Sequence, residues 1–91
     1  PDMGAVADAI TAKLAAAFSP ERLEVVDQSE KHRGHGGWRE GGETHFDVRV
    51  VAAAFAGLSR LERQRRINTV LRDELAGPVH ALSLQALAPG E

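Results

Sequence analysis

The chain has 91 residues, which is the length of one small domain, and a domain of this size buries only about 60% of the surface that its unfolded chain exposes. Apolar residues make up 43% of the sequence and charged residues 26%, which is typical of a folded globular protein and unlike a disordered segment. The absence of cysteine excludes a disulfide framework, a thiolate metal cage and a cysteine nucleophile, and the net charge of −2 disfavours non-specific attraction to nucleic acid phosphates as the main activity.

The first third of the chain predicts a helix followed by a strand. One apolar residue recurs at every fourth position of an alanine-rich stretch: Val6, Ile10, Leu14 and Phe18. This spacing is typical of a helix that lies on a core. Ser19-Pro20 ends the helix, because proline disfavours the helical conformation in the residue before it. Leu23 and Val25-Val26 stand among charged neighbours and predict a strand over about residues 22–27.

A glycine-rich segment and a second strand come next. Residues 28–42 hold five of the nine glycines and show no apolar period, which predicts a flexible loop. From Thr44 to Val51 the residues alternate, with Phe46, Val48 and Val50 on one face of the predicted strand. The two strands and the loop between them predict a long hairpin.

The last third predicts a second helix and a third strand. Ser59 and Glu62 have the S-x-x-E spacing of a capping box at a helix start, and Gly77-Pro78 marks the helix end. The predicted apolar stripe consists of Leu61, Ile67, Val70, Leu71 and Leu75. Residues 79–86 predict a strand that runs parallel to the second one, because a helix connects the two. The expected fold is therefore α/β, more narrowly α+β, in the order helix-strand-strand-helix-strand, with residues 1–91 as a single domain.

Several short motifs together resemble the BolA family. They are Leu23-Glu-Val-Val-Asp-Gln-Ser29, His32, Glu43-Thr-His-Phe46, Val50-Val51, Phe55-x-Gly57, Arg63-Gln-Arg65, Asp73-Glu-Leu75 and Val79-His-Ala-Leu82. They follow the order and spacing of the family over nearly the whole chain. The resemblance implies a three-stranded mixed sheet with helices on one face, similar to the class II KH arrangement. The glycine loop with which KH domains clamp nucleic acid is missing, since Gly57-Leu-Ser-Arg60 lacks the second glycine.

The resemblance also implies a partner and a cofactor. BolA-like proteins are partners of monothiol glutaredoxins, and the pair shares a [2Fe-2S] cluster whose sulfur donors are the glutaredoxin cysteine and a glutathione thiol. Imidazole can replace thiolate on one iron. By this resemblance, His80 stands at the position of the family's histidine ligand. His32 stands at the position of the second ligand, which is cysteine or histidine in the family, and His35 is the next choice for it. The implied function is a non-enzymatic adaptor in cluster trafficking or iron regulation.

Spacing alone favours plainer roles for these histidines. His80 shares parity with Leu82 and Leu84 and reads as an ordinary structural residue, while His32 and His35 read as solvated loop residues. His45 is expected to pack or form a hydrogen bond on the sheet.

The alternative function is a DNA-binding transcriptional regulator, because the second helix carries Arg60, Arg63, Arg65 and Arg66. The acidic net charge, the missing clamp loop and Gln64, where the family usually has histidine, weigh against it. A solvated helix face that docks a protein partner is the preferred interpretation of these arginines.

An enzyme is not expected, because no nucleophile is paired with a base, and the neighbouring carboxylates Asp73 and Glu74 point apart on a helix. No apolar run approaches the ~18 residues of a membrane span and no signal sequence is visible, so we expect a cytoplasmic protein without membrane contact. When free it is expected to be a monomer or a weak homodimer.

Overall fold

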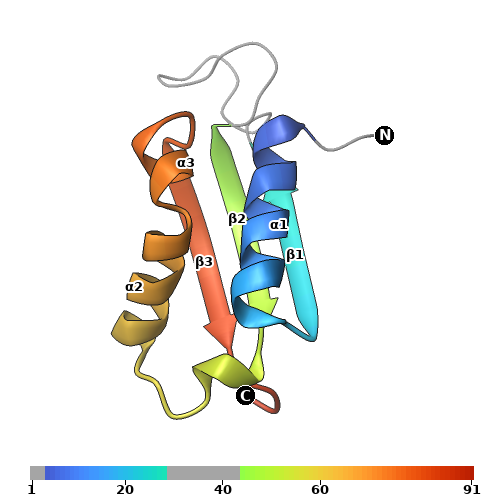
Figure 1. Cartoon of the computed structure of the whole chain (residues 1–91), viewed down its shortest axis with the longest axis vertical. Helices are drawn as coiled ribbons and strands as arrows, with labels where there is room; N and C mark the ends of the chain where they lie inside the picture. Colours follow the sequence, from blue (N-terminus) through green and yellow to red (C-terminus); the bar gives the residue numbers. More distant parts are fainter. Residues whose placement is uncertain (1–3, 29–43) are drawn as a thin grey trace.

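The computed structural model describes residues 4–28 and 44–91, and Figure 1 shows how their elements are arranged. Along the chain these are α1 (Ala5–Phe18), β1 (Arg22–Asp27), β2 (His45–Val51), the short 3-10 helix η2 (Ala53–Phe55), α2 (Arg60–Val70), α3 (Arg72–Ala76) and β3 (Ala81–Leu87). The predicted order of helix, two strands, helix and strand is confirmed, with the second helical segment divided in two. No helix in the described ranges is long and apolar enough to cross a membrane.

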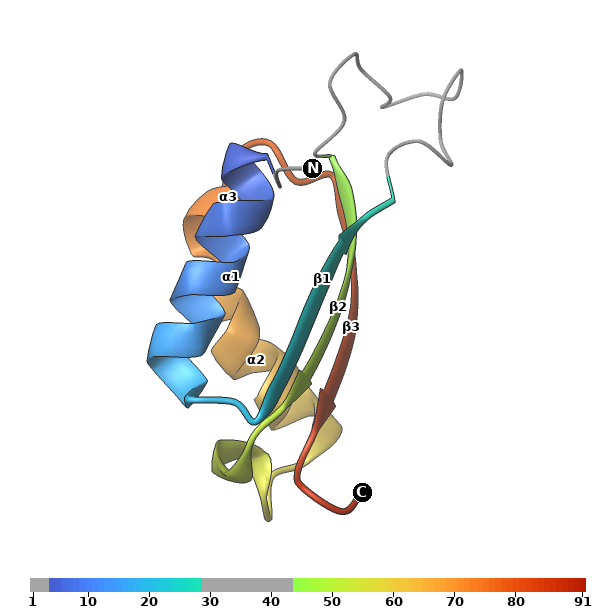
Figure 2. The same ribbon diagram turned by 90° about the vertical axis from the view of Figure 1, so that its right-hand side faces the viewer.

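The three strands form one mixed sheet in the order β1-β2-β3. β1 is antiparallel to β2, with Val25 opposite Val48, and β3 is parallel to β2, with Leu84 opposite Val48. The parallel pairing confirms the prediction, since the chain crosses from β2 to β3 through helices. Seen edge-on, the helices all lie on one side of the sheet (Figure 2). The other side of the sheet is not covered by any described element.

The core lies between the sheet and the helices and follows the predicted alternation of β2. Phe46, Val48 and Val50 are at most 2% exposed. The helices contribute Ala7, Ile10, Leu14 and Ile67, and Leu71 adds to the core from the junction between α2 and α3. Burial of a large apolar side chain contributes roughly 1.5–3 kcal/mol, so these few residues supply much of the stability of so small a domain.

The predicted apolar stripe of the second helical segment is confirmed at Ile67, Val70, Leu71 and Leu75, which lie in or against the core, but not at Leu61. Arg63, Ile67 and Leu71 are 8%, 0% and 1% exposed, whereas Leu61 is 56% exposed. Residues four apart share one face of a helix, and Leu61, two residues before Arg63, lies on the opposite face. The prediction was therefore wrong at Leu61, and Arg63, which was expected on the solvated face of the helix, is buried instead.

The second helical segment bends at Leu71 instead of running on unbroken. Leu71 leaves the helical conformation, with φ −99° and ψ 19°, yet its N–H still donates to the carbonyl of Ile67 at 2.9 Å. In α3, Glu74 is 9% exposed and accepts a hydrogen bond of 3.0 Å from Nζ of Lys13 on α1, while the side chain of Asp73 is 87% exposed. Nζ of Lys13 also lies 3.8 Å from Oδ2 of Asp73, so the two carboxylates approach the same ammonium group and the prediction that they point apart was wrong. Glu74 ties α3 to α1.

Candidate functional site

His80 lies at the start of β3, at the end of the sheet where β2 also begins. Val79 before it is 4% exposed and donates its N–H to the carbonyl of Glu74 at 3.0 Å. The N–H of His80 donates to the carbonyl of Thr44 at 2.7 Å, which fixes the backbone against β2. Its side chain is exposed, because His80 comes just before the strand and does not continue the core face of β3. His80 is therefore not the structural residue within the fold that its spacing alone suggested.

His45 lies beside His80, and sequence reasoning did not foresee this. The two ring centroids are 6.1 Å apart and the rings are tilted by 44°. His45 is half-buried, and its Nδ1 lies 2.7 Å from Oγ1 of Thr44, whose side chain is fully buried. The expectation of a hydrogen bond on the sheet is confirmed. The missing signal was the parallel register, which sets His45 opposite Ala81 and so brings the residue before Ala81 next to it.

The hydroxyl of Thr44 gives His45 a typical feature of metal-binding histidines. Such histidines usually hold one ring nitrogen in a hydrogen bond to an oxygen, which fixes the orientation of the ring. No group of three or more histidine, cysteine or acidic side chains that could hold a metal ion occurs among residues 4–28 and 44–91. Iron–sulfur clusters take four ligands, so two imidazoles at this place would supply half of a set.

The other two predicted ligands, His32 and His35, lie outside the described residues. The described positions nearest to them are Gln28 and Thr44. Both are at this end of the sheet, since the N–H of Gln28 donates to the carbonyl of His45 at 2.7 Å. The assignment of His32 or His35 as the second ligand stays a prediction.

The predicted arginine face of α2 is mostly engaged within the chain. Arg65 and Arg66 lie 4.0 and 3.3 Å from the carboxylate of Glu62. That residue also donates its N–H to the hydroxyl of Ser59 at 3.1 Å, which confirms the predicted helix start. Within the described part of the chain, Arg60 is the only one of the four α2 arginines that makes no ion pair.

Arg63 is a structural residue, not a surface cation. Its Nε donates to the carbonyl of Leu58 and its Nη1 to that of Ala86, both at 3.0 Å, and the two Nη atoms lie 2.6 and 2.8 Å from the carboxylate of Glu91. The hydrogen bond with Arg63 and one from the N–H of Ala88 lower the pKa of Glu91 from 4.5 to about 2. The same hydrogen bond raises the pKa of Arg63.

Comparison with known proteins agrees with the resemblance in the sequence. The family model described as BolA-like protein matches residues 14–91. BolA-like protein 1 of Pongo abelii is 48% identical over 98% of this chain, which covers 62% of that protein, less than two thirds of its length. The DNA-binding transcriptional regulator BolA of Vibrio cholerae is 40% identical over 94% of this chain and 77% of its own length.

A solved structure extends the agreement to the fold. The BolA domain of SufE1 from Arabidopsis thaliana superposes with a TM-score of 0.85 at 42% identity, with 97% of this chain and 96% of that domain covered. The match of the family model, the identity of the relatives and the shared mixed sheet lead to one conclusion: the chain belongs to the BolA-like family.

Proposed function

We propose that this chain is a non-enzymatic adaptor that binds a monothiol glutaredoxin and shares a [2Fe-2S] cluster with it, in cluster trafficking or iron regulation. The observation that carries the proposal is the exposed imidazole of His80, whose backbone is fixed to Thr44 and which lies 6.1 Å from the ring of His45. Membership of the BolA-like family supports it.

The ligand assignment follows from the donors that the chain has. It contains no cysteine, so the thiolates for a shared cluster come from the glutaredoxin and from glutathione. His80 supplies one imidazole and His32 the second, with His35 as the alternative. Replacing thiolate by neutral imidazole removes negative charge from the cluster and raises its reduction potential. The cluster is cargo passed between proteins, and this chain contributes binding and orientation.

The test is reconstitution of the complex. The chain is mixed with a monothiol glutaredoxin, glutathione, ferrous iron and sulfide, and the heterodimer is isolated and reduced. We expect a coloured species whose pulsed EPR spectrum contains nitrogen couplings from histidine. His80→Ala should remove one of these couplings or prevent the complex from holding the cluster. An unchanged spectrum in His80→Ala contradicts the ligand assignment.

Three further histidine variants identify the second ligand and serve as controls for one another. We expect His32→Ala to alter the nitrogen couplings, and His35→Ala to do so only if it is the ligand instead. His45→Ala removes a neighbouring imidazole of the same sheet end and should leave both couplings in place. If His45→Ala alone changes the spectrum, the second ligand is His45 and the assignment to the glycine-rich segment is wrong.

DNA binding is the second candidate, and the name of the Vibrio cholerae relative favours it. The engagement of Arg63 by Glu91, and of Arg65 and Arg66 by Glu62, weighs against a large cationic surface. A titration with duplex DNA at near-physiological salt tests it. Sequence-specific binding that weakens steeply with added salt and in Arg60→Gln would rank this function above the adaptor.

A further inference from the structure

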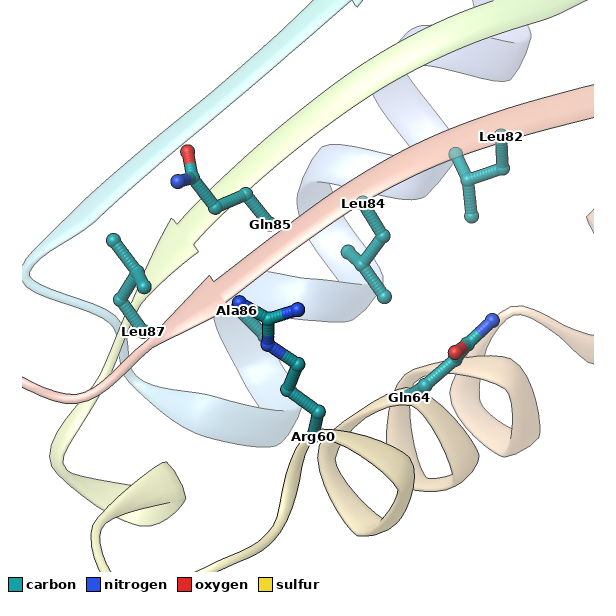
Figure 3. A pocket seen from close by; sticks show the side chains of 7 residues that line it. All are labelled: Arg60, Gln64, Leu82, Leu84, Gln85, Ala86 and Leu87. Atoms are coloured by element: carbon teal, nitrogen blue, oxygen red, sulfur yellow. The ribbon is translucent and has the colours of Figure 1, made fainter.

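A groove lies between α2 and the outer edge of β3, and the described residues that line it include no histidine. Its volume is about 440 Å³, and it is lined by Arg60 and Gln64 of α2 and by residues 82 and 84–87 of β3. Figure 3 shows the side chains of Arg60 and Gln64 reaching from the helix toward the strand. Leu82 and Leu84 are only half-buried, so their apolar side chains contribute to the groove wall.

The backbone of β3 presents an open edge to this groove. In a parallel strand the N–H and C=O groups of alternate residues face the same side. Ala81 and Leu87 face β2, because the N–H of Ala81 donates to Thr44 and the carbonyl of Leu87 accepts from Ala52. The backbone N–H and C=O groups of residues 82, 84 and 86 therefore point to the open edge of the sheet, away from β2.

The hydrogen bonds on the outward side leave most of this edge available. The carbonyl of Ala86 accepts from Nη1 of Arg63, which confirms the outward direction. The N–H and C=O groups of Leu82 and Leu84 have no backbone partner among the described residues, where β3 pairs with β2 alone. Unpaired edges of this kind accept a further strand.

The charge of the groove comes from one arginine. Arg60 is the α2 arginine without an ion pair in the described ranges, while the other three are paired with Glu91 or Glu62. A single unpaired guanidinium above an edge that alternates N–H donors with C=O acceptors matches a peptide that carries a carboxylate. A nucleic acid fits this groove less well, because its phosphates would lie against the outward carbonyl oxygens and Arg60 is the one cation among the described residues that line the groove.

We infer that the α2/β3 groove binds an extended segment of another protein, which adds as a strand to β3 and pairs an acidic side chain or a terminal carboxylate with Arg60. Strand addition between a sheet edge and a flanking helix is an established mode of peptide recognition, in which main-chain hydrogen bonds give affinity and side-chain pockets give specificity. The peptide side chains that point toward the helix layer would contact Leu82 and Leu84. This inference does not depend on His80 or on a cluster.

The experiment uses the full chain and a phage-displayed library of random heptapeptides. Selected peptides are synthesised and titrated into isotope-labelled chain by NMR. We expect peptides that share a carboxylate, and amide shifts concentrated at Leu82, Leu84 and Ala86. Arg60→Gln should weaken binding about fivefold, and Arg65→Gln on the exposed side of the same helix should not.

Modified peptides separate strand addition from other contacts without altering the fold of the chain. N-methylation at one peptide position at a time should abolish binding at alternate positions and be tolerated between them, because only every second peptide N–H faces β3. Failure to select a peptide, an N-methylation pattern without alternation, or equal binding by Arg60→Gln overturns the inference. So does concentration-dependent dimerisation through β3, or occupation of this groove by an oligonucleotide in preference to any peptide.

Discussion

The two ends of β3 differ in how their polar groups are used. At the start, His80 is exposed, and His45 is half-buried with a hydrogen bond to Thr44. At the finish, the guanidinium of Arg63 is held by two carbonyls and by the carboxylate of Glu91, and its side chain is 9% exposed. A buried charged group must find its partners within the fold, whereas an exposed imidazole stays available to another molecule.

This difference separates stability from function along one strand. Substitutions at the finish of β3 should lower the free energy of unfolding and leave metal binding unchanged in the protein that folds. Substitutions at its start should leave the free energy of unfolding nearly unchanged and impair metal binding. Each prediction below tests one side of that contrast.

The largest effect is expected for Phe55→Ala near the finish of β3. Phe55 is 0% exposed, and its ring centroid lies 4.9 Å from that of Phe18. Removing a buried ring leaves a cavity and should cost about 3–5 kcal/mol of unfolding free energy in denaturant titrations. His80→Ala, at an exposed position, should change the same quantity by no more than about 0.5 kcal/mol. A comparable loss in His80→Ala would show that the start of β3 is structural as well.

A smaller effect is expected for Arg63→Met, which is shorter than arginine but keeps an unbranched apolar stem. The variant leaves the carbonyls of Leu58 and Ala86 without their donor and the carboxylate of Glu91 without its cation. The denaturation midpoint should fall clearly. Arg65→Met is the matched control, because Arg65 is 67% exposed and should stay within about 0.5 kcal/mol of the parent. Equal midpoints in the two variants would mean that the buried network contributes no net stability.

Most of the fold could be predicted from residue patterns because it depends on local periodicity. The alternation of Phe46, Val48 and Val50 identified β2, and Ser19-Pro20 together with Leu23 and Val25 identified β1 with the observed bounds. α2 could not be predicted in the same way. Reading arginine as a surface residue placed Leu61 inside and Arg63 outside, whereas the acceptors that permit burial of Arg63 come from Leu58, β3 and the residue at position 91.

The residues of the candidate site could not be identified from local periodicity. His80 was identified through the family resemblance, since its spacing favoured an ordinary structural residue. The proximity of His45 required the register of the parallel pair, which no local pattern specifies. His32 and His35 lie outside the described residues, so their role still depends on the resemblance alone.

Of the three destabilising substitutions, Glu91→Gln is expected to have the smallest effect, and the dependence of this effect on pH is the sharpest test of the finish of β3. The pKa of Glu91 falls from 4.5 to about 2 in the folded chain, so the ionised carboxylate stabilises the fold. This contribution is complete above pH 4.5 and is lost as the pH falls from 4.5 toward 2. Unfolding free energies measured across this window should therefore fall more steeply for the parent than for Glu91→Gln. The two should approach each other as the pH nears 2, where the parent carboxylate becomes protonated in the folded chain too. In an Arg63→Met background, Glu91→Gln should change the slope much less, because the cation that makes the largest contribution to the shift is gone and the hydrogen bond from the N–H of Ala88 remains. If the slope changes there by as much as in the parent background, Arg63 does not hold the carboxylate, and the two ends of β3 differ less than their contacts indicate.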